Sequence, residues 1–176
     1  GALTDAIACS NSGGYFGGEL KLSGWDMVIF EGKSPHPVYV MIRDDDVQIL
    51  DARDFIWGET AWEAEDRIRT RHQDPLIRVA TIGRAGEAMV RFACVMNDKD
   101  RAAGRSGVGA VMGSKNLKAV GVRGTVGVRV HDPAAFMKIV SEMRQKLDTH
   151  AARNRLNAVG THAMMDNTNA YGSLPT

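Results

Sequence analysis

Residues 96–118 form the segment of this chain with the clearest chemical potential. The segment contains four glycines and several basic side chains, among them Arg101, Arg105 and Lys115. Glycine lets backbone amides approach a ligand closely, and an arginine fork can hold a phosphate through two hydrogen bonds. The pattern indicates anion or phosphate binding at a loop that leads into a helix.

Two nucleotide-binding fingerprints can be tested on the same segment, and neither is met. Residues 107–113 have one residue too many for GxGxxG, and residues 113–115 lack the GK[ST] of a P-loop. The residues themselves leave two interpretations open. The segment either binds a phosphate, as in a nucleotide-binding module, or its glycines only permit tight packing while its arginines stay solvated.

Catalytic constellations are missing from the sequence pattern. His36 lies between two prolines, and His72 is expected with Asp74 at the end of a helix. The remaining histidines, His131, His150 and His162, have no carboxylate partners at ligand spacing, and no GxSxG elbow occurs. Cys9 and Cys94 lie far apart without a CxxC, so the chain can build neither a disulfide framework nor a complete zinc or iron–sulfur site. We interpret the chain as a binding surface without its own catalytic machinery.

Composition excludes several classes of partner. The chain has 176 residues, 44% of them hydrophobic, and a formal net charge of +1. This balance argues against binding to nucleic acid or an anionic membrane, which normally require a clustered basic excess. No run approaches the length of a membrane span and no signal peptide is recognisable, so we predict a cytoplasmic protein.

The elements that must position this segment can be outlined from hydrophobic patterning. We expect a glycine-rich loop at residues 11–18, an acidic turn at residues 44–46, and a helix that starts with a Thr60–Glu63 capping box and runs to about His72. An aspartate and a proline, Asp132 and Pro133, open a further helix to His150. Expected strands cover residues 27–31, 38–43, 47–50, 76–82, 89–96 and 117–122. We predict an α+β fold with mixed or antiparallel sheets over residues 1–126, followed by the start of a helical domain over residues 127–176.

Blocks of residues along the chain resemble one family, the tungsten-containing aldehyde ferredoxin oxidoreductases. The resemblance rests on the order and spacing of many short blocks between residue 1 and about residue 125. The most specific are NSGGYFG at 11–17, EGK at 31–33, MND at 96–98, RAAGR at 101–105 and GVGAVMGSKNLKA at 107–119. The chain departs from the family pattern at Arg84, where proline is usual, and at Ser106, where glycine is usual.

The resemblance implies a cofactor and residues that bind it. In the family, tungsten is held by the dithiolenes of two pterins, whose phosphates are bridged by magnesium. By position, Asn11 resembles the side-chain ligand of that Mg2+ and Ala102 the residue that offers its backbone carbonyl. The surface around the pterins and phosphates would comprise Gly13, Arg101, Ala103, Gly104 and Arg105.

The same resemblance implies the function. The parent enzyme would oxidise an aldehyde to a carboxylic acid and pass electrons through a [4Fe-4S] cluster to ferredoxin. Its metal would be tungsten or molybdenum, and a homodimer is a possible assembly in this family. The cluster ligands and the acid/base residues of the family would lie beyond Thr176, and a further pterin-contacting arginine before Gly1. We therefore expect a fragment that has no catalytic residue and is inactive alone. The alternative is a non-catalytic module that binds a nucleotide or phosphate through residues 101–115.

Overall fold

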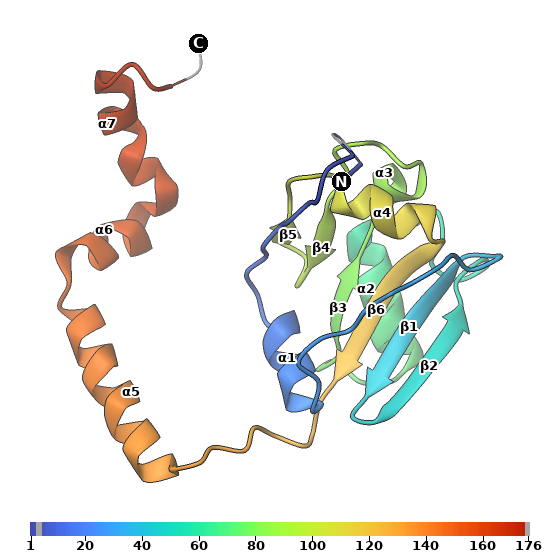
Figure 1. Cartoon of the computed structure of the whole chain (residues 1–176), viewed down its shortest axis with the longest axis horizontal. Coiled ribbons are helices and arrows are strands. Elements are labelled where there is room, and N and C mark those ends of the chain that lie inside the picture. Colours follow the sequence, from blue (N-terminus) through green and yellow to red (C-terminus); the bar gives the residue numbers. More distant parts are fainter. Residues whose placement is uncertain (3–4, 175–176) are drawn as a thin grey trace. The chain divides into compact units, whose positions relative to one another are not determined.

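The computed structural model describes residues 1–2 and 5–174 of the chain. These residues form two units, Gly1–Val128 and Arg129–Thr176, which we describe separately. Figure 1 shows a sheet with surrounding helices in the first unit and helices alone in the second. None of the helices in the described ranges is both long and apolar enough to cross a membrane.

The first unit alternates short helices with strands. Its elements are α1 (Phe16–Leu22), β1 (Val38–Arg43), β2 (Asp46–Asp51), α2 (Ala61–Arg71), β3 (Arg78–Thr81), α3 (Arg84–Glu87), β4 (Val95–Asn97), β5 (Arg101–Ala103), α4 (Val108–Ser114) and β6 (Leu117–Arg123). The six strands form one sheet in the order β2-β1-β6-β3-β4-β5. Only the β1–β6 pair is parallel, and the other neighbours are antiparallel. The predicted α+β class with a mixed sheet is confirmed.

The sheet has a hydrophobic layer on each face. Strand β1 contributes to both layers, because Tyr39 and Met41 point to one face and Val40 to the other. Helix α2 covers the first face, and α1, α4 and the segment between α1 and β1 contribute side chains to the second. Figure 1 shows α2 behind the sheet and the α1–β1 segment crossing in front of it. Burial on both faces explains why β1 is a continuous apolar run instead of an alternating one.

The predicted capping box at the start of α2 is confirmed. The Thr60 hydroxyl accepts from the Glu63 backbone N–H at 3.2 Å, and the Glu63 carboxylate accepts from the Thr60 N–H at 2.9 Å. Two backbone donors that a helix start leaves unpaired are therefore satisfied.

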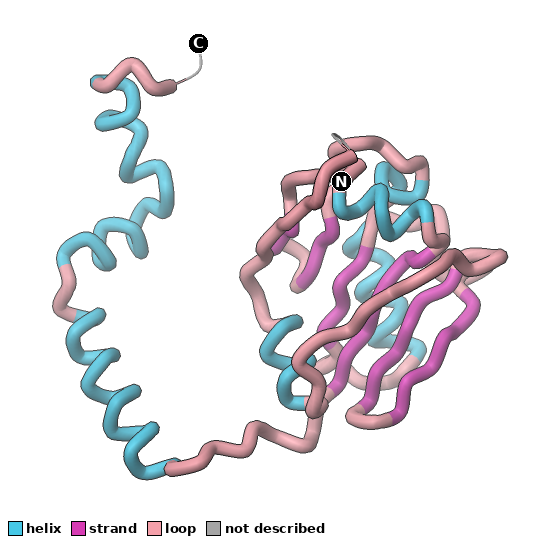
Figure 2. Tube along the Cα trace, viewed as in Figure 1, coloured by secondary structure: helices cyan, strands magenta, loops and turns pink. Residues whose placement is uncertain are grey.

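Residues 27–31 are not a strand, which corrects the sequence prediction. They form an extended segment outside the sheet, drawn as loop in Figure 2. Val28 and Phe30 pack on the second face of the sheet, while Met27 and Ile29 are 68% and 72% exposed. The prediction rested on an apolar and β-branched run, but this run lies on the sheet and is not hydrogen-bonded within it.

Two further predictions were wrong in their extent. The expected strand over residues 89–96 is mostly turn and irregular structure, since Met89 has a φ of 54° and strand pairing begins only at Val95. The glycine cluster at residues 11–18 is a loop only in its first part, since α1 begins at Phe16 and includes Gly17 and Gly18. Glycine content alone was a poor guide here, because the helix is held by packing of Phe16 and Leu20 on the sheet.

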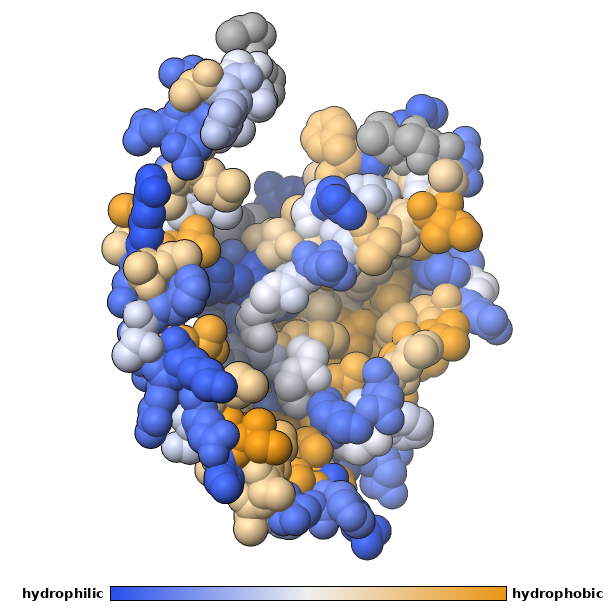
Figure 3. All heavy atoms as spheres, turned by 60° about the vertical axis from the view of Figure 1, so that its left-hand side comes forward, coloured by the Kyte–Doolittle hydropathy of each residue, from blue (hydrophilic) through white to orange (hydrophobic). Residues whose placement is uncertain are grey.

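The second unit consists of α5 (Pro133–Asp148), α6 (Ala151–Val159), the 3-10 helix η1 (Gly160–Met164) and α7 (Met165–Ala170). The predicted start of α5 is confirmed, since Asp132 accepts from the Ala135 N–H at 3.0 Å and Pro133 occupies the first turn. Apolar side chains of α5 are exposed within this unit, among them Phe136 at 50%, Met143 at 52% and Leu147 at 54%. Figure 3 shows apolar side chains at the surface in both units.

Candidate functional site

A short hairpin at the sheet edge positions the predicted arginine segment. Strands β4 and β5 pair so that Asn97 lies opposite Arg101, and residues 98–100 form the turn. Asp98 and Lys99 have φ values of 44° and 62°, a conformation that tight hairpin turns use and that aspartate tolerates. Strand β5, which carries Arg101, Ala102 and Ala103, is therefore an edge strand.

Helix α2 supports this turn from the interior. The buried Glu65 carboxylate accepts from the Lys99 backbone N–H at 3.1 Å, and the Lys99 ammonium lies 2.7 Å from Asp66. Burial raises the pKa of Glu65, although Arg69 at 2.7 Å opposes this shift. The hairpin is thus anchored to the core through a charged group that sequence reasoning did not single out.

The N-terminal segment lies against the end of this hairpin. The Arg105 N–H donates to Ser10 Oγ at 3.2 Å and the Arg105 guanidinium to the Cys9 carbonyl at 3.4 Å. Ser10, Asn11, Gly104 and Arg105 line an open hollow of about 520 Å3. Residues 10 and 105, which are 95 positions apart in the chain, are therefore brought to one place.

Gly13 and Arg101 form a second part of the same surface. A Cβ at Gly13 would lie 3.7 Å from Cδ of Arg101, so the two residues are in ordinary contact distance. All of the predicted site residues except Ala103 are exposed, and Ala103 is partly buried. The structure thus brings together the residues that the resemblance selected: Asn11, Gly13, Arg101, Ala102, Ala103, Gly104 and Arg105.

The charges around the site leave two guanidinium groups available. Within the part of the chain that the structure describes, neither Arg101 nor Arg105 forms an ion pair with a carboxylate. The neighbouring acid, Asp98, pairs instead with Arg78 at 3.2 Å. Two unpaired arginines beside glycine backbone can bind an anion with several oxygens.

Residues 106–115 have a different role from the one suggested by their glycines. A Cβ at Gly109 would overlap the Cys94 carbonyl, and a Cβ at Gly113 would overlap the Gly86 carbonyl. These glycines therefore let α4 pack directly on α3 and on the residues that precede β4. The Lys115 ammonium donates to the Gly32 carbonyl at 3.0 Å. The packing interpretation therefore holds for these glycines, and Lys115 is bonded to the backbone of the residue 30–35 segment and not to the N-terminal loop.

Ser106, where the family usually has glycine, adopts a φ of 71°. This is the left-handed region that favours glycine, so serine here carries backbone strain of about 1 kcal/mol. Its hydroxyl donates to the Cys9 carbonyl at 3.4 Å, which adds a third link between the N-terminal segment and the hairpin.

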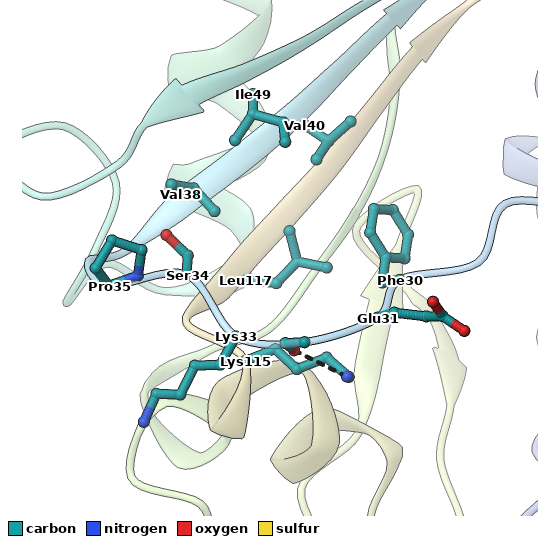
Figure 4. A pocket seen from close by; sticks show the side chains of 11 residues that line it. Phe30, Glu31, Lys33, Ser34, Pro35, Val38, Val40, Ile49, Lys115 and Leu117 are labelled. Carbon is teal, nitrogen blue, oxygen red and sulfur yellow. Dashed lines mark hydrogen bonds between the residues drawn. The ribbon is translucent and has the colours of Figure 1, made fainter.

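A second pocket of about 430 Å3 lies between the segment at residues 30–35 and the sheet. Figure 4 shows Val38, Val40 and Leu117 around it, with Lys115 bonded to the Gly32 carbonyl at its mouth. It is lined by none of the predicted site residues. Its apolar walls carry no set of groups that converge on a ligand, so we do not assign the chemistry to it.

Comparison with known proteins identifies the class. Residues 1–124 match the family model "Aldehyde ferredoxin oxidoreductase, N-terminal domain". The chain is 49% identical over 175 residues to the tungsten-containing aldehyde ferredoxin oxidoreductase of Pyrococcus abyssi, which covers 99% of the chain and 29% of that protein. It is 41% identical over 144 residues to the WOR-like subunit of an aliphatic sulfonate oxidoreductase from Pyrococcus furiosus, covering 73% of the chain and 23% of that protein.

A solved structure shares the fold. The active site complex BamBC of benzoyl coenzyme A reductase, in complex with 1,5-dienoyl-CoA, superposes with a TM-score of 0.76 and 40% identity, over 79% of the chain and 21% of that protein's chain. Fold and sequence together define the N-terminal domain of an oxidoreductase. The chain belongs to the aldehyde ferredoxin oxidoreductase family, as the resemblance predicted, and spans about 29% of the length of its curated tungsten-containing relatives.

Proposed function

We propose that this chain is the cofactor-binding portion of a tungsten or molybdenum bis-pterin oxidoreductase that oxidises aldehydes to carboxylic acids. The observation that carries the proposal is that Asn11, Gly104 and Arg105 line one open hollow, while Arg101 lies against Gly13 of the same N-terminal loop. The tungsten in the names of the relatives supports the same assignment.

The donors around the hollow fit a phosphate–magnesium group. Mg2+ prefers oxygen ligands and keeps few protein contacts, and here the Asn11 amide oxygen and the Ala102 carbonyl would supply them. Arg101 and Arg105 carry charge that no carboxylate neutralises in the described ranges, which suits phosphate oxygens. No three His, Cys, Asp or Glu side chains gather into a metal site within residues 1–2 and 5–174, so this donor set is one of amide, carbonyl and guanidinium groups.

Each residue of the candidate site would have a defined role. Gly13 and Gly104 would let the flat ligand approach the backbone, because neither has a side chain in the way. The guanidinium groups would orient the phosphates through paired hydrogen bonds. Ala103 would complete the contact surface on the edge strand.

The bound cofactor would supply the two-electron chemistry, and this portion of the protein would hold and orient it. Transfer of electrons through a [4Fe-4S] cluster to ferredoxin, and binding of the aldehyde, are proposed for residues outside this chain. The relatives include proteins named for sulfonate and benzoyl coenzyme A chemistry, so the aldehyde is the part of the proposal that rests on the tungsten-containing relatives alone.

The test is elemental and pterin analysis of the full-length polypeptide that carries this segment, purified without oxygen. We expect about one tungsten or molybdenum, about two pterins and about four irons per chain. Asn11→Ala and Arg101→Ala should each lower metal and pterin content. A matched variant at an exposed site of the same unit that does not line the hollow, Arg53→Ala, should keep both.

The rival class makes the opposite prediction. A nucleotide-binding module would contain neither metal nor pterin and would bind free ATP in a way that depends on Arg101. That result would overturn the proposal. Full occupancy in both site variants would leave the enzyme class standing and would refute the assigned residues.

A further inference from the structure

Asp98 lies at the junction between the two halves of the candidate site. It begins the turn of the β4–β5 hairpin, three positions before Arg101, and its side chain is only 11% exposed. One carboxylate oxygen accepts from the Tyr15 backbone N–H at 2.5 Å, and the other lies 3.2 Å from Nη1 of Arg78. One partly buried carboxylate therefore joins the N-terminal loop, the hairpin and strand β3.

Asn97, the preceding residue, holds the same loop at two more points. It is 5% exposed, and with its amide oriented to satisfy both neighbours its oxygen accepts from Ser12 Oγ at 2.6 Å. Its nitrogen then donates to the Gly13 carbonyl at 3.0 Å. The loop that carries Asn11 and Gly13 is thus bonded to the hairpin at three positions, Ser12, Gly13 and Tyr15.

Gly14 explains how the loop comes so close. Its φ is +91°, and a Cβ there would overlap the side-chain amide of Asn97 and the carboxylate of Asp98 and lie 3.1 Å from Cγ of Arg101. The bare backbone at this position lets the loop lie flat on the turn. Gly14, and not Gly13, is the loop position where only glycine fits.

The charge of Asp98 is compensated without using the site arginines. A carboxylate close to a phosphate site would repel the ligand, but Arg78 pairs with this one from the neighbouring strand β3. The Arg78 guanidinium also lies 4.8 Å from the centroid of the Tyr15 ring. This contact helps to hold Tyr15, whose backbone N–H donates to Asp98. Arg101 and Arg105 remain available for the ligand.

We propose that Asp98 is a positioning residue of the cofactor site. Through the Tyr15 N–H and Arg78 it holds the loop of Asn11 and Gly13 in register with Arg101, without itself touching the ligand. This inference rests on the proposed function, because it assumes that the two halves of the site bind one cofactor. Outer residues that orient ligand-binding groups commonly change metal retention by about 10- to 100-fold when they are replaced.

The experiment compares variants of the full-length polypeptide. Asp98→Ala removes both contacts, whereas Asp98→Asn keeps an oxygen for the Tyr15 N–H and suits the left-handed backbone. Asp100→Ala is the matched control, because Asp100 lies exposed in the same turn and its side chain has no bond to the loop. Ile68→Val, on the buried face of α2, controls for a general loss of stability.

Two readouts separate positioning from folding. In protein stripped of cofactor, Asp98→Ala should speed hydrogen exchange of the Tyr15 amide by about tenfold or more, since it loses a bond to a charged acceptor. In the loaded protein, the same variant should retain tungsten or molybdenum and pterin about tenfold less tightly against a chelator. Asp98→Asn should recover much of the Tyr15 protection and part of the retention, while both controls should match the wild type.

The outcomes distinguish this inference from the function on which it rests. A wild-type protein without metal or pterin refutes the proposed function, and the positioning role falls with it. A loaded wild type whose Asp98→Ala variant retains cofactor like Asp100→Ala refutes the positioning role alone. Equal losses in Asp98→Ala and Ile68→Val would also refute it, because they would show a general effect of stability.

Discussion

The buried ion pair between Lys118 and Glu87 provides the most direct test of how this domain is held together. The Lys118 side chain is fully buried, and that of Glu87 is 9% exposed. Besides each other, Lys118 bonds the Glu59 carbonyl at 2.8 Å and Glu87 accepts from the Gly58 N–H at 3.0 Å. The pair thus joins strand β6, helix α3 and the loop before α2.

Replacing either partner leaves a buried charge, but the two losses differ in kind. Lys118→Met preserves the buried stem and strands the Glu87 carboxylate, so we expect a loss of about 3–5 kcal/mol in the free energy of unfolding. Glu87→Gln keeps an acceptor for Gly58 and leaves the Lys118 ammonium without its counter-charge. Lys118 can then lose its proton, which at pH 7 costs at most about 5 kcal/mol, from a reference pKa of 10.5.

The pH dependence follows from the direction of the pKa shift. Burial lowers the pKa of Lys118, and hydrogen bonding to Glu87 opposes this. In Glu87→Gln the opposing effect is removed, so the folded pKa falls further below the unfolded value of 10.5. Between those two values the unfolded chain binds more protons, and stability must rise with pH by up to about 1.4 kcal/mol per unit. The penalty of Glu87→Gln should therefore shrink from pH 7 towards pH 10, and that of Lys118→Met should not.

The assay is urea unfolding of the chain followed by tryptophan fluorescence between pH 7 and pH 10. All three tryptophans, Trp25, Trp57 and Trp62, lie in the first unit, so the signal reports on the unit that contains the ion pair. Lys21→Met is the control, since the ion pair of Lys21 with Asp26 is exposed and should contribute less than about 1 kcal/mol. This reasoning would be refuted if Lys118→Met and Lys21→Met lowered the free energy of unfolding equally. It would also be refuted if the destabilisation by Glu87→Gln were the same at pH 7 and pH 10.

Two other predictions concern helix packing and acid stability. Gly113→Ala should lower the free energy of unfolding by about 1–3 kcal/mol, because its Cβ meets the Gly86 carbonyl. Gly18→Ala has open space in α1 and should raise the free energy of unfolding by about 0.5–1 kcal/mol. Urea titration of both variants would show whether their stabilities change in opposite directions. Hydrogen bonds from Arg53 lower the pKa of Asp51 to about 2 from its model-compound value of 3.8, so wild-type stability should fall as pH drops through that window. Asp51→Asn should flatten that part of the stability profile, and an unchanged profile would show that Asp51 does not contribute to it.

Local signals in the sequence predicted the elements that depend on neighbouring residues. The Thr60–Glu63 box and the Asp132–Pro133 start need only a few consecutive positions, and both are present. The strand predicted over residues 27–31 is absent, because an apolar and β-branched run indicates side chains that can be covered and not whether the backbone has a partner strand. Strand β5 escaped prediction because its three residues pair only with β4 and carry no β-branched side chain.

The candidate site shows a similar limit. Composition and spacing indicated anion binding near Arg101 and Arg105, but nothing local connected these residues with Asn11. That connection came from resemblance to a family, and the structure shows its physical basis in the bonds of Arg105 to Ser10 and Cys9. Asp98 was visible only as part of a family motif, because its role depends on Tyr15, a residue 83 positions away.

The two edges of the sheet differ in their tendency to recruit other chains. Strand β5 has three residues and runs into Gly104, so it offers almost no template for an added strand. Strand β2, at the opposite edge, has six residues, with Val47 50% and Ile49 72% exposed. Aggregation of this domain should therefore begin at β2. Ile49→Lys should suppress it without changing strand β5, which carries the candidate site residues.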